Sequence, residues 1–272
     1  MKPSFLERIV AHKQKEVLEA KARISEQRLL ETAHAIKSRR SLVKALGFPD
    51  SSRVNIIAEI KRASPSKGIF SPDLNAARLA TAYEAAGAAA ISVLTDKHFF
   101  KGSGEDLMAA KKASTLPVLR KDFVVSSYQV MEAAAWGADA VLLIARIIST
   151  EQIQDYLSLC VEFGLDALVE VHSEADLEKV QQTNARLIGI NNRDLSTFET
   201  DIQRAMDLVR RLTPDQIPVA ASGITGPDDV RRNVAVGLRN FLVGESLVRA
   251  DNVRLHMAAL LSAGGASENG RH

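Results

Sequence analysis

The sequence predicts a TIM (β/α)8 barrel with an N-terminal helical extension. Two observations indicate this α/β fold class. From residue 54 onward, eight short apolar runs rich in β-branched residues alternate with longer helical stretches, at the spacing of one βα unit. Eight strands that are each followed by a helix is the count of this barrel. The first 46 residues have a different pattern, with apolar residues at helical intervals among many lysines, glutamates and arginines.

The first 46 residues are expected to form two or three amphipathic helices outside the barrel. The breaker-rich stretch 47–52 ends this segment, and we expect the barrel at residues 47–262. An apolar stripe near the start has no room inside eight strands, so we expect residues 1–46 to cover the barrel mouth and a barrel without them to fold. The stripe consists of Phe5, Leu6, Ile9 and Val10.

The eight apolar runs are expected to be the barrel strands in chain order. Runs this apolar suit strands that are buried on both faces, as in a parallel sheet. A doubly wound open sheet is the alternative, but it usually has fewer strands and a glycine-rich first turn, and no G-x-G-x-x-G motif follows the first run. The runs are residues 54–60, 89–94, 116–119, 140–144, 167–171, 187–190, 218–221 and 240–243.

Helix-start and helix-stop signals lie between the runs. Serine caps and a first-turn proline predict five helix starts, and glycines end several of the helices. The glycine-rich stretch 263–272 is expected to be a disordered tail. The start signals are Ser71, Ser126, Ser149, Ser173 and Pro227, and the stop signals are Gly87, Gly137, Gly164 and Gly237.

The composition is that of an ordinary globular protein. Hydrophobic residues make up 46% and charged residues 25% of the chain, which excludes a disordered chain and a collagen-like fibre. The 35 basic and 33 acidic residues leave a net charge of +2, so neither nucleic acid nor an anionic membrane is expected as a partner. The single cysteine, Cys160, excludes an internal disulfide. Because no segment resembles a signal peptide or a membrane span, we expect a cytoplasmic protein.

Ionisable and amide side chains occur where the predicted strands end, which is where such barrels carry their chemistry. Strand alternation places Glu59 and Lys61 on one face, and Asn191 and Arg193 on another shared face. Each residue alone is typical of a solvated loop, and Glu59 with Lys61 fits a structural ion pair. Five of them, from four strands, converge on one ring, and two lysines with two glutamates suit proton transfer. The ring is Glu59, Lys61, Lys121, Glu170 and Asn191.

Two glycine-bearing loops follow the seventh and eighth runs. Ser222-Gly223 and Gly244-Glu245 each lead into a predicted helix, and glycine lets backbone N–H groups approach an anion. Such loops are the common phosphate site of this barrel, although two tight turns need glycine as well. Ser64 lies in a candidate mobile loop after the first run, where it can bond a ligand carboxylate.

The sequence contains no metal or cofactor motif. The six histidines are scattered without ligand spacing, and neither a Walker motif nor a Ser-His-Asp arrangement occurs. His98 and His172 have no obvious partner. These features favour an acid–base enzyme that uses neither a metal nor a cofactor.

Several of these segments resemble the indole-3-glycerol-phosphate synthase family. The most specific are residues 57–68 and 189–195, which hold the polar ends of the first and sixth runs. The resemblance extends from Phe5 to Leu261, through the N-terminal helices as well as the barrel. The other matching segments are residues 92–96, 118–123, 168–172, 222–224 and 241–247.

The resemblance implies a lyase of tryptophan biosynthesis. The family converts 1-(2-carboxyphenylamino)-1-deoxyribulose 5-phosphate to indole-3-glycerol phosphate, with release of CO2 and water. It implies that Lys121 is the general acid of ring closure, that Glu170 is the general base, and that Lys61 holds the anthranilate carboxylate. The other implied residues orient the substrate (Glu59, Asn191 and Arg193) or hold its phosphate (Ser222, Gly223, Gly244 and the backbone N–H of Glu245).

Other functions stay open on the residues alone. A Schiff-base aldolase would use Lys61 or Lys121 as its nucleophile. Another phosphate-binding barrel enzyme, such as a phosphoribosyl isomerase, and a non-catalytic phosphosugar-binding regulator are further alternatives. The expected partner is a small phosphorylated substrate, and the expected assembly is a monomer or a weak homo-oligomer.

Overall fold

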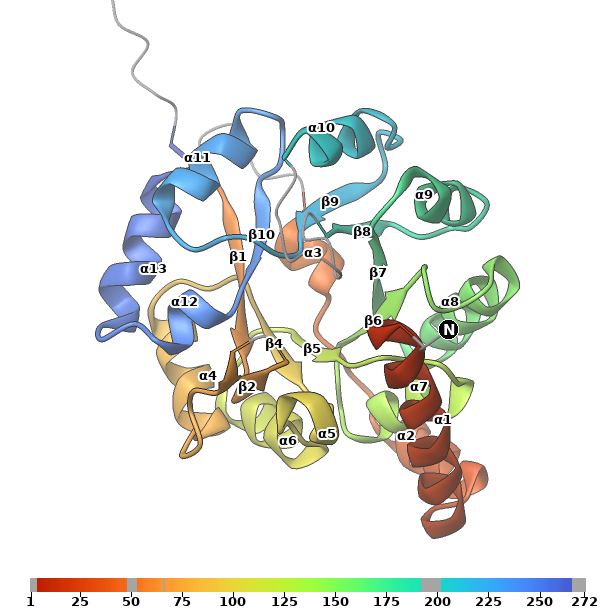
Figure 1. Cartoon of the computed structure of the whole chain (residues 1–272). Helices are drawn as coiled ribbons and strands as arrows, with labels where there is room; N and C mark the ends of the chain where they lie inside the picture. The colour runs from red at the N-terminus through yellow and green to blue at the C-terminus, as the bar shows by residue number, and fades with distance from the viewer. Residues whose placement is uncertain (1–3, 48–52, 66, 192–201, 266–272) are drawn as a thin grey trace, which may run out of the picture.

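Eight parallel strands close into a barrel in the computed structural model, which describes residues 4–47, 53–65, 67–191 and 202–265. The barrel strands are β1 (Asn55–Ile60), β4 (Ala90–Leu94), β5 (Val118–Lys121), β6 (Ala140–Ile144), β7 (Asp166–Val171), β8 (Leu187–Ile190), β9 (Ile217–Ala220) and β10 (Asn240–Val243). Each strand pairs with its neighbours in chain order, and β1 closes the ring between β4 and β10 (Figure 1). The predicted fold class and the eight predicted strands are confirmed.

Helices form the outer layer around the barrel (Figure 1). The helices that follow the strands are α4 (Ala76–Ala85), α5 (Lys97–Phe100), α6 (Gly104–Ala113), α7 (Ser127–Ala135), α8 (Thr150–Phe163), α9 (Glu174–Gln181), α10 (Ile202–Arg210), α11 (Pro227–Val234), α12 (Glu245–Val248) and α13 (Val253–Ser262). The N-terminal segment supplies α1 (Phe5–Arg23), α2 (Glu26–Ala35) and α3 (Leu42–Leu46).

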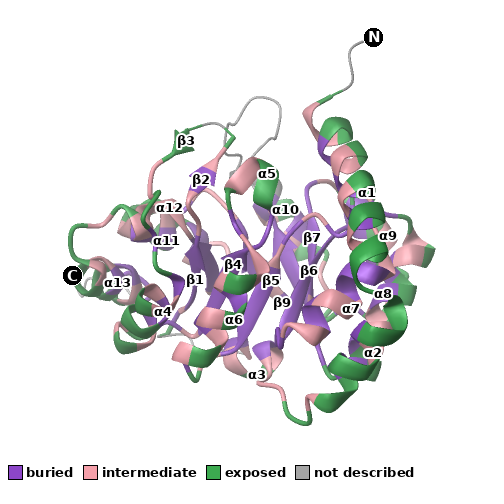
Figure 2. Cartoon of the chain, turned by 90° about the horizontal axis from the view of Figure 1, so that it is seen from below, coloured by how far each residue is buried: buried purple, intermediate pink, exposed green. Residues whose placement is uncertain are grey.

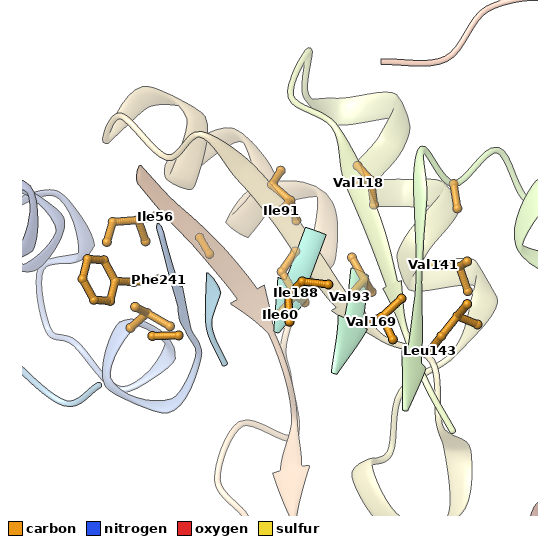
Figure 3. Close-up of a cluster of buried hydrophobic side chains, with 14 of the residues drawn as sticks. Ile56, Ile60, Ile91, Val93, Val118, Val141, Leu143, Val169, Ile188 and Phe241 are labelled. Atoms are coloured by element: carbon orange, nitrogen blue, oxygen red, sulfur yellow. The ribbon is translucent and has the colours of Figure 1, made fainter. Parts of the chain in front are cut away.

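Alternation along the strands sorts the core into two layers. Side chains such as Ile56 and Val118 point outward and pack against the helices, as Figure 3 shows. Their neighbours Ile57, Leu119 and Leu168 point inward and fill the barrel. The polar residues that share the inward face at the strand ends are therefore directed into the barrel mouth.

The loop after β1, which the sequence predicts as a candidate mobile loop, contains two short strands. It forms an antiparallel hairpin of β2 (Ala63–Ser64) and β3 (Gly68–Ile69), at the same end of the barrel as α5 (Figure 2). The helix start predicted at Ser71 is wrong, because α4 begins at Ala76 with Asn75 as its cap. The other predicted starts, at Ser126, Ser149, Ser173 and Pro227, are confirmed.

Helix α3 closes the amino-terminal end of the barrel, opposite the mouth (Figure 2). Leu42 and Leu46 are 0% exposed and pack with the inward-facing side chains of the strands. Asp166, the first residue of β7, accepts hydrogen bonds of 2.9 Å from Ser41 Oγ and Val43 N. The prediction that all of residues 1–46 cover the mouth is therefore wrong for α3, whose apolar side chains belong to the barrel core.

Helix α1 is tied to the mouth end of the barrel by a buried cluster of charges. Lys13 is 0% exposed, and its Nζ lies 2.8 Å from both Asp96 Oδ2 and Asp122 Oδ1, just beyond β4 and β5. Burial acts to lower the pKa of Lys13, but the two carboxylates raise it above its usual value. Tyr128 of α7 also donates a hydrogen bond to the Ala20 carbonyl.

The C-terminal tail is only partly described, and the described helices can be checked for membrane spans. Residues 266–272, most of the predicted tail, lie outside the described residues, whereas Ala263 is buried. No helix in the described part of the chain is long and apolar enough to cross a bilayer.

Candidate active site

A cavity of about 370 Å³ opens at the carboxyl ends of the strands. A larger cavity, of about 550 Å³, lies beside Ser41 and Asp166 at the other end of the barrel and holds none of the predicted site residues. Arg193 lies outside the described residues. The mouth cavity brings together all the other predicted site residues: Glu59, Lys61, Ser64, Lys121, Glu170, Asn191, Ser222, Gly223, Gly244 and Glu245.

Glu170 is the centre of the polar network in this cavity. Its Oε1 lies 2.9 Å from His172 Nε2 and 3.0 Å from Asn191 Nδ2, which both donate hydrogen bonds to it. Lys121 Nζ lies 3.9 Å from its Oε2. Burial acts to raise the pKa of Glu170, but the charge of Lys121 and the two hydrogen bonds together lower it to about 2. The buried carboxylate is therefore ionised at neutral pH.

A second carboxylate–ammonium pair lies at the end of β1. Lys61 Nζ is 2.9 Å from Glu59 Oε1, and both side chains line the cavity. A Cβ atom at Gly244 would collide with the Glu59 carboxylate, so a larger residue where β10 approaches this pair would displace that carboxylate. The Glu59–Lys61 ion pair considered from the sequence is thus present, and it lines the cavity, where it can act on a ligand.

Asn191 connects the β7 side of the cavity with the loop after β9. Its Nδ2 donates to Glu170, and its Oδ1 accepts a hydrogen bond of 2.5 Å from Ser222 Oγ. Ser64 Oγ, from the β2–β3 hairpin, is buried and has no hydrogen-bond partner among the described residues. A buried hydroxyl without a partner is costly, and a ligand in the cavity can satisfy it.

The loops after β9 and β10 form another part of the wall. Gly223 has a φ of +82°, which glycine adopts without strain. Lys67 Nζ and Arg249 Nη1 lie 2.8 Å and 3.3 Å from Glu245 Oε1. Burial acts to raise the pKa of Glu245, but Lys67, Lys61 and Arg249 together lower it below its usual value. The carboxylate of Glu245 is therefore paired with cations while its backbone stays in the first turn of α12.

An apolar wall completes the cavity. Phe5, Leu6 and Ile9 of the predicted stripe on α1 reach it, as expected from the sequence. Phe100, the last residue of α5, and Phe123, which follows β5, extend this wall with ring centroids 6.1 Å apart. The sequence did not predict this aromatic pair, since nothing local to either residue indicates that the two segments meet.

Sequence reasoning also missed His172, which lines the cavity beside Glu170. The two residues are two apart at the end of β7, so strand alternation alone could have placed them on one face. The described residues contain no group of three or more His, Cys, Asp or Glu side chains that could hold a metal ion. The expectation of a reaction without metal or cofactor stays a prediction.

A sequence model of the family described as indole-3-glycerol phosphate synthase matches residues 6–260. The chain belongs to this family. Its function is therefore the synthesis of indole-3-glycerol phosphate in tryptophan biosynthesis, a carboxy-lyase reaction on a phosphorylated substrate. Membership decides against the aldolase, isomerase and regulator alternatives.

Relatives within the indole-3-glycerol phosphate synthase family match almost the whole chain. The indole-3-glycerol phosphate synthase of Syntrophobacter fumaroxidans is 51% identical over 259 residues, which cover 95% of this chain and 98% of the relative. That of Desulfosudis oleivorans is 52% identical over 259 residues, with the same coverage. The match therefore includes the N-terminal helices as well as the barrel.

Solved structures of other enzymes share the barrel. A thiamine phosphate pyrophosphorylase from Pyrococcus furiosus has a TM-score of 0.56 and 17% identity, covering 78% of this chain and 95% of its own. An N-acetylmannosamine-6-phosphate 2-epimerase from Clostridium perfringens has a TM-score of 0.57 and 13% identity, covering 78% and 92%. At such low identity these likenesses show the fold alone.

Proposed function

We propose that the mouth cavity binds 1-(2-carboxyphenylamino)-1-deoxyribulose 5-phosphate in one defined orientation. Its phosphate lies against Ser222-Gly223 and Gly244-Glu245, and its aromatic ring lies against the apolar wall. The observation that carries this proposal is that both of these parts, together with Lys121 and Glu170, line a single cavity. The phosphate is distant from the reacting carbons, so it supplies binding energy for positioning.

Lys121 is the general acid of ring closure in this proposal. Attack of the aromatic carbon on the substrate ketone puts negative charge on the ketone oxygen, and the Lys121 ammonium neutralises and protonates it. The carboxylate carbon then leaves the ring as CO2, and the electrons of the broken bond restore aromaticity. The reaction therefore needs no cofactor as an electron sink.

Glu170 is the general base of the dehydration that completes the indole. Its carboxylate takes one proton from the methylene carbon beside the amine nitrogen. The hydroxyl on the former ketone carbon leaves as water with a proton from Lys61, and a double bond forms between the two carbons. Lys61 also holds the substrate carboxylate, and Glu59 orients Lys61 through their 2.9 Å pair.

Three further residues complete the proposed site. Asn191 orients Glu170 through its 3.0 Å hydrogen bond. Ser64 donates its buried hydroxyl, which lacks a partner among the described residues, to the substrate carboxylate. Arg193 is proposed to orient the substrate, on the strength of the sequence resemblance alone.

A Ser222→Ala exchange tests the proposed phosphate position. Ser222 Oγ donates to Asn191 in the ligand-free structure, and in this proposal it turns to donate to the bound phosphate. Loss of this hydrogen bond to a charged group is expected to raise KM about tenfold or more, with the inhibition constant of inorganic phosphate rising in parallel. Steady-state kinetics with phosphate as a competitive inhibitor measures both. If phosphate inhibits the variant as well as the wild type, the phosphate lies elsewhere in the cavity.

We further propose a cytoplasmic protein that acts as a monomer or weak homo-oligomer and binds neither nucleic acid nor membranes. The net charge of +2 supports the absence of polyanionic partners. Cys160 is buried, and burial together with Asp166 raises the pKa of its thiol to about 12, so it packs as a small apolar residue. Light scattering at several concentrations tests the oligomeric state.

A further inference from the structure

The two carboxylate oxygens of Glu170 have different surroundings. Oε1 takes hydrogen bonds from His172 Nε2 at 2.9 Å and from Asn191 Nδ2 at 3.0 Å. Oε2 is buried, has no hydrogen-bond partner among the described residues, and lies 3.9 Å from Lys121 Nζ. One oxygen is thus held by the protein, and the other is left to receive a proton.

We propose that His172 is a positioning residue for proton transfer: it holds Oε1 of Glu170 so that Oε2 faces the substrate. This inference rests on the proposed role of Glu170 as the general base. It assigns a role to a histidine for which the sequence showed no partner.

The protein fixes the place of His172 without help from a substrate. Glu170 and His172 are two residues apart at the end of β7, so both side chains turn to the inner face. The backbone N–H of His172 donates to Asp176 Oδ2 at 3.0 Å, in the first turn of α9, and Arg146 Nη2 lies 3.2 Å from the same oxygen. His172 is 3% exposed, so its ring has little room to turn away.

The ionised carboxylate of Glu170 determines how His172 is protonated. A carboxylate only accepts hydrogen bonds, so Nε2 of the imidazole carries a hydrogen. His172 therefore donates this hydrogen to Oε1, and Oε2 is left for a proton from the substrate.

The experiment compares His172→Gln and His172→Ala in steady-state kinetics. A glutamine amide can still donate a hydrogen bond to Oε1, whereas alanine cannot. The glutamine variant should keep kcat within about threefold of wild type. The alanine variant should lose about 10²-fold in kcat, the scale of a misplaced catalytic group, with a much smaller change in KM.

The matched control is His34→Gln, an exposed histidine on α2 that is expected to keep the wild-type kcat and KM. A His172→Ala variant with wild-type kcat overturns the positioning role, and so does a His172→Gln variant that loses as much kcat as His172→Ala. Wild-type kcat in Glu170→Gln instead overturns the proposed base, which separates the two failures. If His172→Ala does not fold by circular dichroism, His172→Leu, which fills more of the space without a donor, takes its place.

Discussion

At the scale of single residues, the site depends on a buried carboxylate that stays charged. Glu170 is buried among Lys121, His172 and Asn191, and these three neighbours together outweigh the effect of burial and lower its pKa to about 2. A carboxylate of this kind takes up a proton only from a substrate carbon that releases it readily, as the intermediate does when it becomes an indole. Changes to its neighbours should therefore affect turnover more than substrate affinity.

Lys121→Met is expected to stop ring closure. Methionine matches the unbranched lysine side chain as far as Cε but has no ammonium to protonate the ketone oxygen, and a general acid typically contributes about 10² to 10⁴ in rate. Steady-state kinetics should show a loss of kcat of at least about 10²-fold, with a much smaller change in substrate affinity measured by calorimetry. The exposed Lys112→Met on α6 is the control. A Lys121→Met variant that keeps about half of the wild-type kcat shows that another group is the acid.

At the scale of elements, the N-terminal segment has two separate roles. Phe5, Leu6 and Ile9 of α1 line the cavity, whereas Leu42 and Leu46 of α3 are packed inside the opposite end of the barrel. Helix α1 borders the cavity and is attached to the barrel surface through Lys13, so it can be removed with less damage than α3, which fills the core. The two roles can therefore be separated by where the chain is cut.

Deletion of residues 1–24 is expected to leave a folded barrel with weakened substrate binding, because it opens the apolar wall to water. Deletion of residues 1–46 is expected to prevent folding, since each buried leucine lost from a core costs about 2 to 5 kcal/mol. Circular dichroism and substrate kinetics on the two variants measure these effects. A shorter variant with unchanged kcat/KM rejects α1 as part of the site, and a folded longer variant rejects α3 as part of the core.

Lys13→Met is expected to destabilise the attachment of α1 strongly. Asp96 and Asp122 lose the cation between them, and breaking a buried ion pair in this way costs about 3 to 5 kcal/mol. Urea unfolding compares this variant with Lys15→Met, an exposed lysine of the same helix that should change stability by less than about 0.5 kcal/mol. Equal stabilities of the two variants would mean that the buried cluster of Lys13, Asp96 and Asp122 contributes nothing to the free energy of unfolding.

At the scale of the whole molecule, the fold should be lost in acid. Asp122 and Glu170 have pKa values lowered to about 2, well below those of unfolded carboxyl groups near about 4. Each therefore stabilises the folded state at higher pH, by on the order of 2 kcal/mol, and loses this contribution as the pH falls from about 5 towards 2. Urea unfolding across this range measures the loss. Stability that does not change between about pH 5 and 3 contradicts the assignment.

The strands and most of the candidate site could be predicted because their signals are local. Alternation along each strand decides which side chains face inward, and the closed barrel brings the inward-facing strand ends to one mouth. Glu59, Lys121 and Glu170 were therefore predictable as neighbours although they lie on three different strands. The family resemblance added their roles.

The remaining features depend on contacts between distant segments. Nothing near Lys13 indicates that two aspartates far along the chain will enclose it. The apolar stripe on α1 predicts that this face of the helix is buried, but not which part of the barrel it packs against. The spacing of Leu42 and Leu46 predicts only one more amphipathic helix, because the sequence does not show which end of the barrel is open. The β2–β3 hairpin has strands of only two residues, which is too short for a periodic signal.

The separate roles of Lys121 and Glu170 are tested most directly by one single-turnover measurement on the Glu170→Gln variant. The substrate carries an isotope label in its carboxylate, and labelled CO2 and indole fluorescence are followed in the same sample. If Lys121 closes the ring and Glu170 acts only in dehydration, CO2 appears at a rate within about tenfold of wild type, while indole appears at least about 10²-fold more slowly. Loss of both signals together, or retention of both, contradicts this division of labour.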